Sequence, residues 1–177
     1  MSGGAPATYF LTSERLGFRT WRSDDLELAA ALWGHPDVAR FVFAGPPGRE
    51  EIAARLGREI ASQSEHGFQY WPIFLRADGR HAGCCGLRPY RPELAIVELG
   101  FHIHPPLWRR GLAREAATAV IDHALTALGA SALFAGHHPD NTASRDLLRG
   151  LGFRYTHDEI YPPTGLLHPS YLLARQA

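Results

Sequence analysis

Hydrophobic residues recur along this chain with two spacings, and the order of these spacings predicts an α/β fold. Apolar residues three or four positions apart, which are typical of an amphipathic helix, occur in four places. The longest such segment covers residues 113–128 and is followed by Gly129. Two others cover residues 26–33 and 49–62, and a fourth, shorter one begins after Asn141. Four helices are therefore expected, each with one apolar face to bury.

Runs of alternating apolar residues and of β-branched residues predict strands around these helices. Strands are expected at residues 14–21, 68–76, 81–87, 94–104 and 131–136, with one or two more after residue 153. The order β-α-α-β-β-β-α-β-α-β predicts a mixed sheet of about six to seven strands flanked by about four helices. The chain shows no linker and no internal repeat, so residues 1–177 are expected to form a single domain.

Composition narrows the functional classes. Of the 177 residues, 45% are hydrophobic and 20% are charged, which is typical of a globular chain that can bury a core. The 18 basic and 18 acidic residues give a net charge of zero, which argues against a nucleic-acid-binding protein. No apolar run has membrane-spanning length, and the first residues, MSGGAPATYF, lack the features of a signal peptide. The two cysteines are adjacent and cannot build a disulfide framework, so a reducing compartment is expected. Together these features predict a cytoplasmic protein with no nucleic-acid or membrane partner.

The segment with the clearest chemistry is WRRGLAREA, residues 108–116, at the start of the longest predicted helix. Backbone N–H groups at a helix start carry partial positive charge, and the small residues Gly111 and Ala113 would let an anion approach them closely. Cationic side chains surround the same point, from Arg109, Arg110 and Arg114. The segment therefore predicts a diphosphate site, and a solvated basic turn is the plain alternative.

Three segments resemble motifs of the GNAT N-acetyltransferases and occur in the order of that family. ELGFHIHPPLWRRGLAREA is similar to the acetyl-CoA-binding segment, in the form found in the branch that contains the ribosomal-protein acetyltransferases. ERLGFRTW resembles the first strand of that branch, and HPDNTASRDLLRGLGF resembles its Asn-x-x-Ser helix. The resemblance covers most of residues 13–154 and implies a GNAT-like mixed, splayed sheet, with acetyl-CoA in the wedge between two parallel strands.

The resemblance also implies the residues of the site. The pyrophosphate contacts fall on the backbone of Arg109, Arg110, Gly111, Leu112, Ala113 and Arg114. The strand edge that binds the pantetheine falls on Phe101, His102 and Ile103. Asn141 matches a cofactor-contacting asparagine, and Ser144 matches a position whose hydroxyl can approach the thioester sulfur. The segments that border the acceptor in the family point here to Trp33, Phe41 and Tyr161.

Acetyl transfer to an amine needs a neutral amine, and Glu98 is the candidate general base. It lies in the middle of an apolar strand, where burial would raise the pKa of a carboxyl toward neutrality. Period-two alternation places Glu98, Gly100 and His102 on one face of the strand. A surface carboxylate is the alternative reading of Glu98, and His102 or His137 would be the next candidates for the base.

Other polar residues have weaker patterns. Tyr161 and Tyr171 are alternatives to Ser144 as the proton donor to the leaving thiolate. His102 and His104 have a metal-like spacing, but no clear carboxylate or cysteine partner accompanies them, so no metal is expected.

We therefore expect an acetyl-CoA-dependent N-acetyltransferase that moves an acetyl group to a primary amine by direct attack on the thioester. The acceptor is a protein N-terminus or a small-molecule amine, with a slight preference for the α-amine because its pKa is lower than that of lysine. A non-catalytic acyl-CoA-binding or sensing module on the same fold is the alternative. A monomer and a homodimer are both open.

Overall fold

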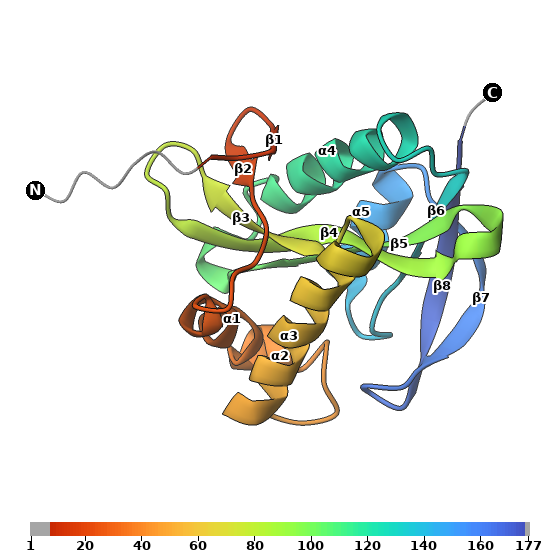
Figure 1. Cartoon of the computed structure of the whole chain (residues 1–177). Helices are drawn as coiled ribbons and strands as arrows, with labels where there is room; N and C mark the ends of the chain where they lie inside the picture. Colours follow the sequence, from red (N-terminus) through yellow and green to blue (C-terminus); the bar gives the residue numbers. More distant parts are fainter. Residues whose placement is uncertain (1–7, 176–177) are drawn as a thin grey trace, which may run out of the picture.

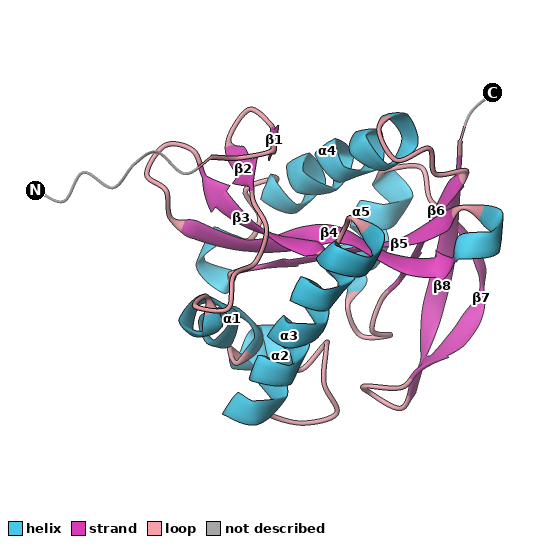
Figure 2. Cartoon of the chain, in the orientation of Figure 1, coloured by secondary structure: helices cyan, strands magenta, loops and turns pink. Residues whose placement is uncertain are grey.

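The computed structural model describes residues 8–175, which build one eight-stranded sheet with helices on both faces (Figure 1; Figure 2). The strand order is β1-β2-β3-β4-β5-β6-β8-β7. The strands are β1 (Leu11–Thr12), β2 (Leu16–Phe18), β3 (Tyr70–Leu75), β4 (His81–Arg91), β5 (Ile96–Ile103), β6 (Ala132–Gly136), β7 (Arg154–Tyr161) and β8 (Leu166–Ala174). The helices are α1 (Leu26–Trp33), α2 (Pro36–Ala39), α3 (Arg49–His66), α4 (Leu112–Thr126) and α5 (Thr142–Gly150).

The predicted α/β class and mixed sheet are confirmed, with slightly more elements than expected. The sheet has eight strands because the chain before β2 folds back as the short β1 and the tail forms the hairpin β7–β8. The described residues form five α-helices, since Pro36–Ala39 make an extra short helix that the His35 side chain caps. Helix α3 runs past the predicted end at residue 62 to His66, because nothing interrupts it before Gly67, which has φ +80°.

Two apolar cores lie on opposite sides of the sheet and use alternate residues of the same strands. Figure 1 shows α3 across one face and α4 with α5 on the other. Cys85 of β4 packs into the core under α4, whereas its neighbour Cys84 packs into the core under α1 and α3. Along β5 the same alternation places Glu98 and His102 on the α1–α3 side, where they contact Tyr70 and Cys84.

The feature that positions the site is the separation of β5 from β6. These two strands are parallel, and their paired residues end at Glu98 and Phe134. Beyond Glu98, β5 continues for five residues to Ile103. Beyond Phe134, β6 continues only to Gly136, and these last residues pair with β8 alone. In Figure 1, β7 and β8 run steeply to the direction of β3–β5, so the two halves of the sheet diverge. The end of β5 therefore has a free edge facing a wedge.

No helix within residues 8–175 is long and apolar enough to cross a membrane. The prediction that the first residues form no signal peptide concerns mainly residues 1–7, which lie outside the described part of the chain. Cys84 and Cys85 are both free and buried.

Candidate active site

A cavity and a cleft adjoin where β5 and β6 separate. The cavity has a volume of about 300 Å³ and is bordered by α3, β5, β6 and the β7–β8 hairpin. The cleft has a volume of about 650 Å³ and is bordered by α2, the end of β5, and the starts of α4 and α5. Both spaces are lined by Phe41, Phe101, His102, Asn141 and Ser144. A group bound in the cleft can therefore meet a group bound in the cavity at these five residues.

The start of α4 forms one wall of the cleft. Gly111 is the N-cap, with φ +77°, and Arg109 just before it also has a positive φ, 60°. Apart from its own helix and chain neighbours, a Cβ atom on Gly111 would find only Arg15 Nη2 of residues 8–175 within 4 Å, at 3.5 Å, so the backbone here is open to an incoming group. The first N–H groups of a helix have no partner within the helix and favour an anion.

The structure places most of the predicted pyrophosphate residues at this wall. The cleft is lined by Arg109, Gly111, Leu112, Ala113 and Arg114. Arg110 is the exception, because it does not line the cleft and its carbonyl accepts a hydrogen bond from Arg15 Nη1 at 2.9 Å. Arg114 Nη1 donates to the Gly150 carbonyl at 3.0 Å and so ties α4 to the end of α5. A helix start flanked by two arginine side chains fits a diphosphate in charge and in donor type.

The remaining residues expected to hold a cofactor also face the cleft. Phe101, His102 and Ile103 line it along the free edge of β5. Asn141 is the N-cap of α5, as the sequence predicts, and its Oδ1 accepts the Ser144 N–H at 3.1 Å. This bond fixes the Asn141 side chain at the junction between the cleft and the cavity, which Ser144 also lines.

Glu98 lines the cavity, and Tyr70 is its hydrogen-bond donor. The Tyr70 hydroxyl donates to Glu98 Oε1 at 3.0 Å. Burial raises the pKa of Glu98 above its ordinary value, although the charge of Arg88 and the Tyr70 hydrogen bond act in the opposite direction. Burial also raises the pKa of Tyr70 well above its ordinary value, so the phenol keeps its proton and stays a donor. Glu98 is therefore a partly desolvated carboxylate in a cavity, and the reading of it as a surface carboxylate is wrong.

A layer of buried groups behind Tyr70 holds this pair in place. The Arg88 guanidinium lies 4.1 Å from the centroid of the Tyr70 ring and forms an ion pair with Glu59, which is 1% exposed. The second oxygen of Glu59, Oε2, accepts the Tyr70 backbone N–H at 2.9 Å. A Cβ on Gly100 would lie 2.1 Å from the Tyr70 hydroxyl oxygen, so only glycine at this position lets Tyr70 reach Glu98.

His102 is held as a neutral ring with a defined tautomer. Trp33 Nε1–H donates to His102 Nδ1 at 3.2 Å, and an indole nitrogen can only donate. Burial lowers the pKa of His102 well below its ordinary value, and the charges of Arg55 and Arg88 add to this effect. The ring proton therefore lies on Nε2, and His102 is a hydrogen-bond donor with no free lone pair, which disfavours it as the base.

Trp33 does not occupy the predicted position. It is fully buried, belongs to the core under α1 and α3, and lines neither the cavity nor the cleft. The expectation that it contacts the acceptor is corrected: its indole acts on the site through His102. Phe41 lines both spaces and Tyr161 lines the cavity, as expected for residues that border an acceptor.

The second alternative base, His137, has both of its ring nitrogens engaged. Its Nδ1 donates to the His138 carbonyl at 2.8 Å, and its Nε2 lies 3.3 Å from the Tyr171 hydroxyl. Tyr171 is buried and lines neither space, so it cannot reach a thiolate in the cleft.

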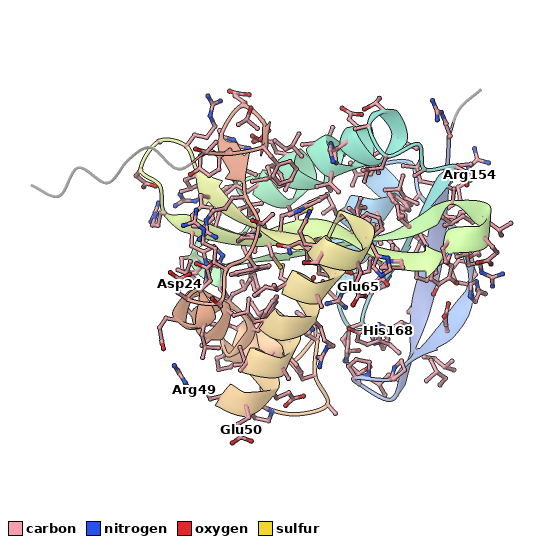
Figure 3. All side chains as sticks on the ribbon, in the orientation of Figure 1. Asp24, Arg49, Glu50, Glu65, Arg154 and His168 are labelled. Carbon is pink, nitrogen blue, oxygen red and sulfur yellow. The ribbon has the colours of Figure 1, made fainter. Side chains whose placement is uncertain are left out.

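His168 of β8 lies 5.6 Å from His138, ring centroid to ring centroid, on the side of the hairpin that faces the loop after β6 (Figure 3).

Sequence reasoning missed Arg55, and it missed Tyr70 as the partner of Glu98. One pattern could have indicated Arg55: Ile52 and Leu56 mark the buried face of α3, and Arg55 and Glu59 lie at helical spacing on that same face. Charged residues on an apolar face are unusual and suggest a buried polar cluster. The Tyr70–Glu98 pair depends on the pairing of β3, β4 and β5, which no local pattern specifies.

Within residues 8–175, no three or more histidine, cysteine, aspartate or glutamate side chains are grouped so that they could hold a metal ion. His104 Nε2 lies 3.0 Å from His81 Nδ1.

Comparison with known proteins identifies the family. Residues 15–154 match the family described as Acetyltransferase (GNAT) domain, so the chain belongs to the GNAT acetyltransferases. It is 27% identical over 145 residues to the protein named Uncharacterized N-acetyltransferase p20 of Bacillus licheniformis, covering 81% of this chain and 82% of that protein. The chain is therefore an acetyltransferase, and its family uses acetyl-CoA.

Solved structures show the same fold. The acetyltransferase from Agrobacterium tumefaciens str. C58 superposes with a TM-score of 0.78 at 23% identity, over 97% of this chain and 100% of that chain. RimL, a ribosomal L7/L12 alpha-N-protein acetyltransferase solved in complex with coenzyme A, superposes with a TM-score of 0.76 at 15% identity, over 92% of this chain and 95% of that one. These likenesses confirm the GNAT fold.

Proposed function

We propose that the chain is an acetyl-CoA-dependent N-acetyltransferase for a primary amine, with acetyl-CoA in the cleft and the acceptor in the cavity. The observation that carries this proposal is that the two spaces adjoin beside Glu98, at the point where β5 and β6 separate. The family match and the unbroken sheet from β1 to β8 support a single acetyltransferase domain.

The residues of the cleft divide the binding of acetyl-CoA between them. The backbone of Gly111 to Arg114 would hold the diphosphate, with Arg109 and Arg114 as flanking cations. Peptide groups of Phe101 and Ile103, on the free edge of β5, would bind the amide groups of the pantetheine. Arg110 has a secondary role, because its side chain does not line the cleft.

Acetyl-CoA supplies the acetyl group as a thioester, and the amine nitrogen attacks the carbonyl carbon, so that a C–N bond forms as the C–S bond breaks. Glu98 takes a proton from the amine, because it is the buried carboxylate of the cavity and burial raises its pKa. His102 and His137 are weaker candidates for the base, since both have their accepting nitrogens engaged.

Two residues at the junction assist the transfer. His102 Nε2–H is the donor available to polarise the carbonyl oxygen, because the Trp33 hydrogen bond keeps the proton on that nitrogen. The Ser144 hydroxyl is the hydrogen-bond donor to the departing thiolate, which then takes its proton from solvent, because Ser144 lines both spaces, whereas Tyr161 lines only the cavity and Tyr171 lines neither.

The acceptor is a primary amine of low pKa, and both a small molecule and a protein N-terminus satisfy this condition. The name of RimL states that its acceptor is a ribosomal protein α-amine, which supports the N-terminal option by likeness of fold only. The cavity volume of about 300 Å³ lies at the small end of ligand sites and supports a small acceptor or a single terminal residue.

An acceptor screen tests the proposal. Thiol release is measured with acetyl-CoA and a broad panel of amines and peptide N-termini, and mass spectrometry identifies any product that has gained an acetyl group. Acetylation of an amine, lost in Glu98→Gln, supports the enzyme. Binding of CoA without thiol release above the uncatalysed rate for any amine would instead support a non-catalytic acyl-CoA-binding module.

A further inference from the structure

Within residues 8–175, one charged side chain in the cavity wall has no hydrogen-bond or ion-pair partner. Arg55 of α3 is 3% exposed and lines the cavity, yet its Nε and Nη2 atoms are buried without a hydrogen bond. Among residues 8–175 no carboxylate forms an ion pair with it. Buried guanidinium groups in proteins normally pair with an anion, because leaving the charge unpaired in a desolvated place is costly.

The surroundings of Arg55 hold its charge in place without neutralising it. The guanidinium carbon lies 4.6 Å from the centroid of the Trp33 ring and 5.6 Å from that of Phe43, and neither ring can accept more than a cation–π contact. Glu59, one helical turn further along α3, is already paired with Arg88. The geometry therefore presents a preoriented cation to the cavity.

Arg55 also lies close to the groups of the proposed reaction. Its charge opposes the burial that raises the pKa of Glu98, and it adds to the burial that lowers the pKa of His102. The cavity thus has an unpaired cation and a carboxylate within electrostatic reach of each other. This arrangement is complementary to a zwitterion, whose ammonium group would face Glu98 and whose carboxylate would face Arg55.

We infer that Arg55 is an anion-binding residue of the acceptor site and that the acceptor is a primary amine carrying a carboxylate close to its amine, as an amino acid does. This inference rests on the proposed function, because it takes the cavity to be the acceptor site. An arginine fork binds a carboxylate through two parallel N–H bonds, so it selects the carboxylate and also orients the amine.

The test compares each amino acid with its own primary amide. The two acceptors differ only in the carboxylate, and removing the carboxylate lowers the basicity of the amine, so basicity alone would favour the amide. We measure kcat/KM for a panel of such pairs, and for peptides that begin with aspartate or glutamate, which separates a free amino acid from an acidic protein N-terminus. In the unchanged protein the acid of a pair should exceed its amide by about 10- to 100-fold.

Variants of α3 assign the preference to Arg55. Arg55→Gln should lower kcat/KM for the acid by about 10- to 100-fold more than for the amide, so that the preference disappears. Any change common to the acid and the amide reports the effect of the Arg55 charge on Glu98 and His102. Arg55→Lys should keep part of it, because the charge remains. Arg58→Gln is the matched control, since Arg58 lies on the same helix but is exposed, and it should keep the full preference. Thermal unfolding and CoA affinity confirm that each variant is folded.

The outcomes are distinguishable. Equal use of acids and amides by the unchanged protein, or an equal loss for both in Arg55→Gln, would overturn the anion site while leaving the acetyltransferase intact. If no amine is acetylated, the proposed function fails, and calorimetric binding of N-acetyl amino acids then decides the anion site by itself. Binding that is lost in Arg55→Gln keeps the site, and absence of binding to the unchanged protein overturns it.

Discussion

The Tyr70 hydroxyl donates a hydrogen bond to Glu98 Oε1 over 3.0 Å, so a residue of β3 reaches across β4 to act on a carboxylate of β5. Two glycines that pair across β4 and β5 make this possible, since a Cβ on Gly100 would collide with the Tyr70 ring and a Cβ on Gly86 would collide with the backbone of Gln69 and Tyr70. The hydrogen bond favours the ionised form of Glu98, whereas burial favours the protonated form. The balance between these two effects sets the pH at which the proposed base becomes active.

Tyr70→Phe tests that balance. The change keeps the ring that stacks with Arg88 and removes only the hydroxyl, so the pKa of Glu98 should rise. The acidic limb of the pH dependence of kcat/KM should move to higher pH, while the rate on the alkaline plateau stays nearly constant. A uniform fall in rate at every pH, with an unmoved limb, would show that the hydroxyl has another role. Tyr9→Phe, far from the cavity, is the control for tyrosine loss.

Glu98→Gln tests the base directly. The amide keeps the size of the side chain and cannot take a proton, so kcat should fall by about 10²–10⁴-fold while CoA affinity hardly changes. The acidic limb of the pH–rate profile should flatten in the same variant. Glu93→Gln, at an exposed position before β5, provides the control. An unchanged kcat in Glu98→Gln would move the base elsewhere.

Gly111→Asp tests the diphosphate wall of the cleft. A carboxylate at the start of α4 would occupy the anion site and repel the phosphates, so calorimetry should show that CoA binding is lost. The left-handed conformation of Gly111 adds a stability cost of about 1 kcal/mol. Gly129→Asp is a matched control, because Gly129 follows the other end of α4 with φ +70° and open space around it. A folded Gly111→Asp protein with normal CoA affinity would contradict the assignment.

Ser144→Ala tests the hydrogen bond to the departing thiolate. Loss of one neutral hydrogen bond, about 1 kcal/mol, should lower kcat by about tenfold without changing the KM for the acceptor. Tyr161→Phe and Tyr171→Phe serve as the comparison, and each should have the smaller effect on kcat. A larger fall in kcat for Tyr161→Phe would transfer the role to the cavity side.

Protonation of His81 should couple stability to pH. Burial, with a contribution from His104, lowers the pKa of His81 to about 4. The unfolded chain binds this proton near the ordinary histidine pKa of about 6.5, so the free energy of unfolding should fall as the pH drops from about 6.5 toward 4. In thermal or urea unfolding His81→Gln should reduce this slope by up to about 1.4 kcal/mol per pH unit. Replacement of the exposed His66 by glutamine should leave the slope as it is.

The local pattern of the chain was sufficient for the elements and for the groups they present. Alternation along 94–104 places Glu98, Gly100 and His102 on one face, because successive residues of a strand point to opposite sides. The helix start at Gly111 and the N-cap at Asn141 follow from residue types within one turn of the chain. These features depend on near neighbours in the sequence, so a sequence pattern can specify them.

Tertiary structure alone decided what meets those groups. Trp33 reaches His102 across 69 positions of the chain, and Tyr70 reaches Glu98 across 28. Arg55 enters the cavity because α3 packs on the face of the sheet that bears Glu98. Arg110 lies outside the lining of the cleft, and its carbonyl binds Arg15 of the β1–β2 turn. Such contacts are set by the packing of whole elements, and local propensity does not specify which distant side chain will fill a given space.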